Sequence, residues 1–146
     1  MKSVHVSRVI AAPLDLVFQT ISNPLNFCEA VPHITNIEFL SAQEKGIGTR
    51  FRETRVMKGR ESTVELEVTE YAQNDRVRMI SDAGGTIWDS VFTLSINSDN
   101  VEMKLQMDIK PHTFIAKIMT PLIWRIVAKG VETDMDVIKE YCEAKV

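Results

Sequence analysis

The stretch Thr120–Tyr141, TPLIWRIVAKGVETDMDVIKEY, decides how the rest of the chain folds. Thr120 can cap the free N–H groups of a helix, and Pro121 suits the first helical position, so we expect a long helix to begin here. Apolar residues then recur at steps of three and four, which predicts one apolar stripe along about six turns. The stripe consists of Ile123, Ile126, Val127, Val131, Met135, Ile138 and Cys142.

The other side of this helix is charged, with Lys129, Glu132, Asp136, Lys139 and Glu140. Burial of each apolar side chain stabilises a fold by about 1.5–3 kcal/mol, so the stripe needs a partner surface. The segment His112–Met119 could add about one or two helical turns. In that case the helix begins earlier and is kinked at Pro121.

The N-terminal part of the chain predicts one strand and two short helices. Side chains alternate over about Ser3–Ala11, as is typical of a strand. Pro13 opens a short helix whose apolar residues recur at helical spacing. Ser22-Asn23-Pro24 combines a capping residue with a proline, so we expect a second short helix that runs to about Ala30.

The middle of the chain changes to an alternating pattern that is cut at regular intervals by turn residues such as Gly84-Gly85. This pattern predicts six strands: Ile34–Ser41, Thr49–Met57, Glu61–Tyr71, Arg76–Asp82, Thr86–Ile96 and Val101–Lys110. Short connections make neighbouring strands antiparallel, and one apolar face needs a cover. We therefore expect an α+β fold in which the C-terminal helix covers a seven-stranded antiparallel sheet, with residues 1–146 as a single domain.

This order of elements, together with several short motifs, resembles the helix-grip fold of the START-like (SRPBCC) superfamily, within its polyketide cyclase/dehydrase and lipid-transport group. The motifs are Val9-Ile10-Ala11-Ala12-Pro13 with Val17-Phe18, Gly48-Thr49-Arg50-Phe51, Gly59-Arg60, Val68-Thr69-Glu70-Tyr71 and Val137-Ile138-Lys139. The resemblance implies a curved sheet wrapped around the long helix, with an apolar cavity between them. Members bind lipids, hormones, polyketides, quinones or aromatic compounds, and some are enzymes. The group shares no catalytic motif, so no catalytic residue is carried over.

Two charged residues fall on a strand face that should be buried. Phe51 and Met57 indicate the inward face of their strand, which places Glu53 and Arg55 on that face too. A buried carboxylate and guanidinium are costly unless they are paired. They orient the polar end of a ligand or of a reacting carbonyl, or they form a structural ion pair, or the strand is twisted enough for both to reach water. They are weak candidates for catalytic residues, and the sequence offers no others.

Other residues are candidates for ligand binding because their side chains fall on the inward face of a strand, are flexible or are small. Trp88 could stack on a flat ligand and donate one hydrogen bond, and Asp89, in the opposite phase, should be solvated. Methionine side chains suit a cavity that adapts to varied ligands, and Gly130 leaves room in mid-helix. The full candidate set is Phe51, Glu53, Arg55, Met79, Trp88, Ser90, Phe92, Met103, Leu105, Met107, Trp124, Val127, Gly130 and Val131. Core packing is the alternative for Trp88 and the methionines, and for Gly130 the alternative is an exposed position where glycine is tolerated.

Composition narrows the class of protein. The net charge of −3 argues against a nucleic-acid-binding surface. No stretch approaches the ~20 apolar residues of a membrane span, and we see no signal peptide. Cys28 and Cys142 are far apart in sequence, which favours reduced thiols in a cytoplasmic protein over the alternative of a disulfide. His5, His33 and His112 are scattered, so we expect no metal site, and no motif indicates a cofactor.

Three functions compete at this point. The first is binding or carriage of a hydrophobic small molecule, which the apolar strand faces favour. The second is a polyketide cyclase- or dehydratase-type enzyme with Glu53 as general acid or base and Arg55 or Trp88 placing the substrate. The third is a protein-interaction module, which is disfavoured because the sequence shows no exposed apolar patch. We expect the first function, with no protein partner identified.

Overall fold

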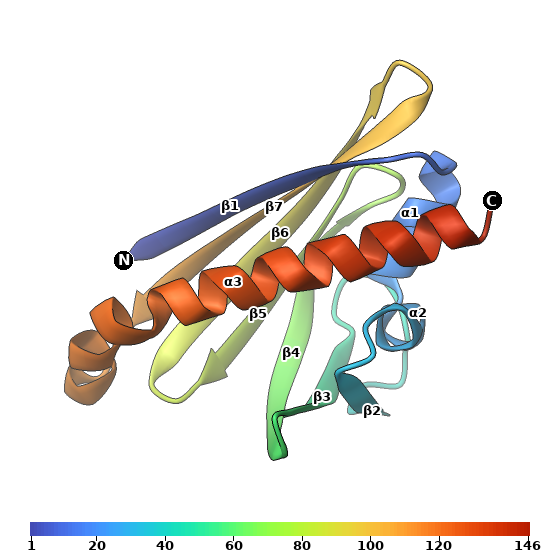
Figure 1. Cartoon of the computed structure of the whole chain (residues 1–146). Helices are drawn as coiled ribbons and strands as arrows, with labels where there is room; N and C mark the ends of the chain where they lie inside the picture. The colour runs from blue at the N-terminus through green and yellow to red at the C-terminus, as the bar shows by residue number, and fades with distance from the viewer.

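The computed structural model describes residues 1–146 and has the expected α+β architecture, with a curved antiparallel sheet and a long C-terminal helix across it (Figure 1). The elements are β1 (Lys2–Ile10), α1 (Leu14–Ser22), α2 (Pro24–Ala30), β2 (Ile34–Phe39), β3 (Arg50–Met57), β4 (Arg60–Ala72), β5 (Arg76–Ala83), β6 (Thr86–Asn97), β7 (Asn100–Pro111) and α3 (Phe114–Ala144). The seven strands lie in the order β1-β7-β6-β5-β4-β3-β2, and neighbours along the chain form hairpins. Only β1 crosses over, to pair with β7.

The two short helices follow their sequence signals. The side chain of Asn23 accepts hydrogen bonds from Leu25 and Asn26 and so caps α2, with Pro24 in its first turn. On α1, Val17, Phe18 and Ile21 are completely buried, as their helical spacing predicts. These helices close one end of the space between the sheet and α3.

The start of α3 differs from the main expectation. The helix begins at Phe114 rather than at Thr120, because the hydroxyl of Thr113 accepts a hydrogen bond from the N–H of Ala116 and caps it there. Pro121 therefore lies inside the helix, as the alternative of an earlier start required. In Figure 1 the turns before Pro121 bend away from the line of the remaining helix. Proline favours such a bend because it removes one N–H and crowds the preceding turn.

The β5–β6 turn fixes this helix start. The carbonyl of Gly85 accepts hydrogen bonds from the N–H groups of His112, at 2.8 Å, and Thr113, at 3.2 Å. Gly85 has a φ of +78°, and a Cβ at this position would clash with the side chain of Thr113. Only glycine suits both the backbone conformation and the close approach.

The apolar stripe of α3 is shorter than expected. Val131, Met135, Ile138 and Cys142 are buried against the core, but Ile126 is 73% exposed. The reason is geometric, since α3 packs most closely on β1 and β7 in its C-terminal part, while its N-terminal turns extend beyond the sheet (Figure 1). The stripe therefore rotates away from the sheet before it reaches the N-terminal turns.

Candidate functional site

A cavity of about 470 Å³ lies between the sheet and α3, on the side of α3 away from β1. Its lining is mainly apolar and comes from α2, β3, β4, β5, β6, β7 and α3: Pro24, Phe27, Phe51, Glu53, Arg55, Met57, Ser62, Val64, Leu66, Met79, Ser81, Trp88, Ser90, Phe92, Leu105, Met107, Ile126, Val127, Gly130, Val131 and Asp134. α3 packs closely on β1 and β7 but stands off from β6, β5, β4 and β3 further across the sheet, and this separation leaves the space open.

Most of the predicted ligand-binding residues meet at this cavity. Those that line it are Phe51, Glu53, Arg55, Met79, Trp88, Ser90, Phe92, Leu105, Met107, Val127, Gly130 and Val131. The register explains the convergence, because Met79 pairs with Ser90 and Ser90 with Met107 across three strands. Their contact with a ligand remains a prediction.

Two predicted residues lie elsewhere. Met103 is completely buried in the core and does not line the cavity, although it points to the same side of β7 as Leu105 and Met107. Trp124 does not line the cavity, because its ring lies under the ammonium group of Lys2, 5.1 Å from the ring centroid. A cation in this position stabilises the indole on the β1 side of α3.

Trp88 lines the cavity but does not have the free hydrogen-bond donor that we expected. Its indole N–H donates to the carbonyl of Ala83 at 3.2 Å. A buried indole N–H normally has such a partner, and here the backbone supplies it. Trp88 can therefore offer a flat apolar surface, and the polar contacts of the cavity must come from other side chains.

The cavity contains one charged group of three residues, which we call the inner cluster: Glu53, Arg55 and Asp134. The Arg55 Nε donates to Glu53 Oε2 at 3.1 Å, and its Nη1 contacts Asp134 Oδ2 at 2.9 Å. Glu53 and Arg55 lie on β3, whereas Asp134 lies on α3, so the cluster bridges sheet and helix. The Glu53 residue is only 8% exposed. The Nη2 of Arg55 makes no hydrogen bond within the protein.

Burial and charge act in opposite directions on the inner cluster. Burial raises the pKa of the Asp134 carboxyl above its usual value, and the nearby Arg55 only partly offsets this effect. For Arg55 burial alone would lower the pKa, but the charges of Glu53 and Asp134 outweigh it and raise the pKa. Burial, and then the charge of Glu53, also raise the pKa of the Cys28 thiol. With both carboxylates ionised, the cluster carries one net negative charge.

Sequence reasoning missed some of the lining, although the same signals could have found it. Asp134 follows Gly130 by four residues and Val131 by three, which places it on the same helix face. Ser81 follows Met79 by two residues on the same strand face. The Ser81 hydroxyl oxygen is buried without a hydrogen-bond partner. Buried hydroxyl groups normally have a partner, so this oxygen is a candidate for contact with a ligand or water.

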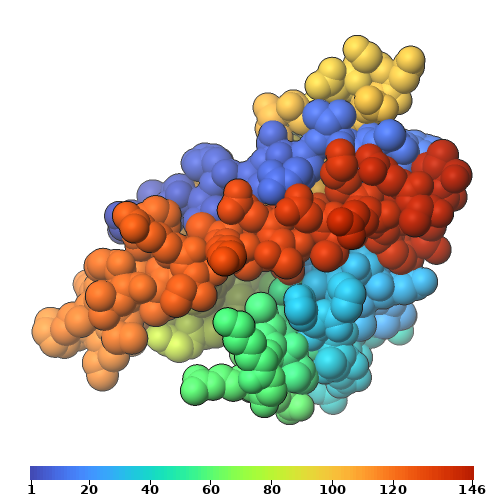
Figure 2. Space-filling model, in the orientation of Figure 1, coloured from blue at the N-terminus to red at the C-terminus, as the bar shows by residue number.

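The mouth of the cavity lies between the β3–β4 turn and the middle of α3. Met57 and Ile126 line the cavity and are also exposed, at 43% and 73%. Met57 was expected to face inward and instead lies at this rim, at the end of β3. In Figure 2 the β3–β4 turn, drawn in green, stands opposite the orange part of α3.

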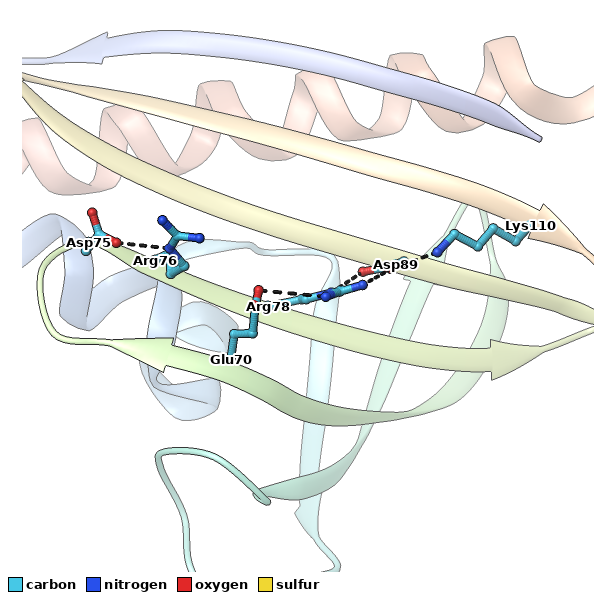
Figure 3. A network of polar contacts seen from close by, with 6 residues as sticks. All are labelled: Glu70, Asp75, Arg76, Arg78, Asp89 and Lys110. Atoms are coloured by element: carbon cyan, nitrogen blue, oxygen red, sulfur yellow. Dashed lines mark hydrogen bonds and ion pairs between the residues drawn. The ribbon is translucent and has the colours of Figure 1, made fainter.

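A second cluster, on the other face of the sheet, overturns one expectation. Asp89 is not solvated but only 3% exposed. Its carboxylate accepts hydrogen bonds from Arg78 Nε at 2.8 Å and Lys110 Nζ at 3.0 Å, and Arg78 also lies 3.8 Å from Glu70. We call Glu70, Arg78, Asp89 and Lys110 the outer cluster (Figure 3). The bonds from Arg78, and then from Lys110, lower the pKa of Asp89 despite its burial.

The outer cluster borders a depression of about 520 Å³ in which only three of the 11 lining residues are hydrophobic. Such a surface suits solvent better than an apolar ligand. The cavity beside α3 is therefore the candidate site. None of the helices combines the length and the hydrophobicity that a membrane-spanning helix requires.

The curved sheet, the long covering helix and the apolar space between them define a helix-grip protein with an internal cavity. The sequence matches the family described as "Polyketide cyclase / dehydrase and lipid transport" over residues 1–143. The chain belongs to this family. No curated protein matches the sequence significantly.

Solved structures agree with this fold at low sequence identity. A START superfamily protein from Mycobacterium smegmatis is 12% identical, with 99% of each chain covered and a TM-score of 0.80. A protein from Thermus thermophilus is 17% identical, with 99% of each chain covered and a TM-score of 0.79. The di-domain ARO/CYC BexL of the BE-7585A biosynthetic pathway is 12% identical, with a TM-score of 0.78 over 96% of this chain and 46% of that one. At these identities the likeness establishes the fold alone.

Proposed function

We propose that the chain binds and carries a hydrophobic small molecule in the cavity between the sheet and α3. The observation that supports this function best is a 470 Å³ space with 13 hydrophobic residues among its 21 lining residues. Ligand sites in proteins commonly enclose about 300–1,000 Å³ and combine an apolar wall with a few polar groups. The family supports the same reading, since its description includes lipid transport.

The inner cluster favours one class of ligand over another. Its net negative charge repels a carboxylate, so a fatty acid should bind less well than a neutral molecule of similar size. Glu53 and Asp134 can accept hydrogen bonds from a hydroxyl group, and the Nη2 of Arg55 can donate one to a carbonyl. We therefore propose a neutral aromatic or polyketide-like ligand with hydroxyl or carbonyl groups, its flat part against Trp88.

Binding can be tested by the quenching of tryptophan fluorescence and by the shift in melting temperature. We expect flavonoids, quinones or aromatic polyketides to raise the melting temperature, and fatty acids of similar length to raise it less. Stabilisation grows with ligand concentration because the ligand binds only the folded state. If no compound of these classes shifts the melting temperature, the proposal is wrong.

Gly130 offers a sharper test of where the ligand lies. A Cβ added at this position would meet no atom within 4 Å, so a larger side chain can enter the cavity. Gly130→Leu should fold normally but weaken binding about tenfold or more by occupying ligand volume. Thr133→Leu is the matched control, since Thr133 is exposed on the same helix. Equal binding by both variants would place the ligand elsewhere.

A polyketide cyclase- or dehydratase-type enzyme is the second candidate, and the inner cluster is the observation that favours it. Glu53 is a nearly buried carboxylate beside a guanidinium, which is an arrangement suited to proton transfer at a bound carbonyl compound. Glu53→Gln should then abolish turnover of a poly-β-ketone substrate while ligand binding persists. Unchanged turnover would exclude this role for Glu53.

The two cysteines bear on the cellular compartment in which the protein acts. Both cysteines are free in the structure, with the Cys142 thiol near the Thr20 hydroxyl at 3.6 Å. Free thiols are compatible with a reducing compartment, so we propose that binding takes place in the cytoplasm. Nucleic acids, metal ions and cofactors have no part in the proposed function.

A further inference from the structure

The N-terminal half of α3 presents an apolar face to solvent, contrary to the expectation of no exposed apolar patch. Its large side chains are Phe114, Ile115, Ile118, Met119, Leu122 and Ile126, which we call the outer apolar face of α3. Phe114 is 77% exposed and Leu122 69%. Ala116 and Thr120, on the opposite side of the same turns, are buried. A contiguous apolar surface of this kind normally marks an interaction site.

Cations border this face, and none of them forms an ion pair within the protein. Lys117, Arg125 and Lys129 are exposed on the same turns of α3. The chain contains no acidic residue between Asp108 and Glu132, although its net charge is −3. Lys2 adds a further positive charge beside Trp124. The end of the molecule that carries the apolar face is therefore locally positive.

We propose that the outer apolar face of α3 docks onto the surface of an anionic lipid membrane. A helix with exposed large apolar side chains and flanking lysine and arginine residues binds lipid by inserting the apolar side chains among the acyl chains. The cations then lie at the level of the anionic headgroups and add electrostatic attraction. The turns involved extend beyond the sheet, so a flat surface can reach them (Figure 2).

Charge favours a membrane over a second copy of the chain. In a symmetric dimer through this face, Lys117, Arg125 and Lys129 of one chain would approach the same cations of the other. Repulsion between them would oppose association, whereas anionic headgroups neutralise all of them. The outer apolar face of α3 also adjoins the cavity, because Ile126 belongs both to this face and to the mouth of the cavity. A hydrophobic ligand could then pass between bilayer and cavity without crossing water.

Vesicle flotation with the full chain tests the docking. We expect binding to phosphatidylcholine vesicles that contain about 30% phosphatidylglycerol, weak binding to phosphatidylcholine alone, and release at high salt. The double variant Ile118→Ser/Leu122→Ser and the double variant Lys117→Glu/Lys129→Glu should each weaken binding about tenfold or more. Their matched controls are Ile96→Ser, at a residue 62% exposed on β6, and Lys45→Glu in an exposed loop.

Membrane docking does not depend on the proposed ligand, so the docking proposal and the ligand-binding proposal can be disproved separately. The Ile118→Ser/Leu122→Ser variant should bind soluble ligands as the unchanged chain does. Absence of vesicle binding, or equal loss in the controls, would overturn the proposal. So would a concentration-dependent dimer, seen by analytical ultracentrifugation, that Ile118→Ser/Leu122→Ser abolishes while vesicles remain unbound.

Discussion

The two faces of the sheet each hold a charged cluster around an arginine, and the clusters differ in what surrounds them. The inner cluster faces an apolar cavity, and burial raises the pKa of Asp134. The outer cluster spans β4 to β7, and two cations lower the pKa of Asp89. Both aspartates contact an arginine, yet the pKa is raised for the one on the inner face and lowered for the one on the outer face.

The difference lies in the number of partners that each carboxylate has. Asp89 accepts two bonds from Arg78 and one from Lys110, which compensates for its desolvation. Asp134 shares one arginine with Glu53, so two carboxylates divide a single positive charge. The outer cluster therefore stabilises the fold, whereas the inner cluster keeps carboxylate oxygens that can still accept hydrogen bonds from a ligand.

The largest effect should follow from removing the arginine of the inner cluster. Arg55→Met leaves Glu53 and Asp134 without a cation in an apolar space, so we expect a loss of about 3 kcal/mol in the free energy of unfolding at neutral pH. The loss should shrink in mild acid because protonation removes the uncompensated charges. Urea unfolding at several pH values measures both effects.

Arg52→Met is the matched control on the same strand. Arg52 is on the opposite side of β3 and pairs with Glu38 and Glu65, and its side chain is 46% exposed. Solvent screens exposed ion pairs, so we expect Arg52→Met to destabilise the protein much less than Arg55→Met does. Equal destabilisation by Arg52→Met and Arg55→Met would show that the ion pairs of the inner cluster contribute no more to stability than a pair on the surface.

A somewhat smaller loss is expected in the outer cluster. Asp89→Asn removes a nearly buried carboxylate from two cations, and hydrogen bonds to charged groups are worth about 1.5–3 kcal/mol, so we expect a loss of about 2 kcal/mol. Ligand binding should be unchanged, because Asp89 lies on the face away from the cavity. A change in ligand affinity without a change in stability would contradict the separation of the two faces.

Asp89 and Asp134 should also differ in how pH alters the cost of their replacement. The pKa of Asp89 is lowered on folding, so its contribution is complete above the unfolded pKa of about 3.9 and is lost as the pH falls through the lower folded value. The cost of Asp89→Asn should therefore stay constant from neutral pH to about pH 5 and decrease only in stronger acid.

Asp134→Asn should lower the free energy of unfolding less than Asp89→Asn does, and the loss should change with pH in the opposite direction. The pKa of Asp134 is raised on folding, so its ionised form is disfavoured in the folded state, and the unmodified protein gains stability as the pH falls through that raised value. We expect Asp134→Asn to lower the free energy of unfolding by less than about 1 kcal/mol at neutral pH, because Arg55 would still be paired with Glu53. The cost should grow in mild acid, and a cost that decreases there would contradict burial as the dominant influence.

The sequence predicted the inner cluster better than the outer one, for a physical reason. Alternation along β3 placed Glu53 and Arg55 inward because one apolar face of a strand is buried. The same rule put Asp89 outward and hence in solvent, but in a twisted sheet the long side chains of Arg78 and Lys110 cover it. Burial on that face comes from neighbouring strands, which alternation along one strand does not describe.

The long helix shows the same limit. Helical spacing identified Val131, Met135 and Ile138 as core residues, and they are buried. It also included Ile126, which is exposed, because spacing does not indicate where a helix leaves its partner surface. The cap at Thr113 was missed because the stronger pair of signals, Thr120 and Pro121, lies seven residues further along.

The smallest effect should come from the rim of the outer cluster. Glu70 lies 3.8 Å from Arg78 and its side chain is 43% exposed, so Glu70→Gln should change the free energy of unfolding by less than about 0.5 kcal/mol. Combined with Asp89→Asn, it should add little, since Arg78 would already have lost its main partner. Urea unfolding of the single and double variants measures this coupling. A cost for Glu70→Gln close to that of Asp89→Asn would mean that the outer cluster acts as one network of four charges rather than as one carboxylate held by two cations.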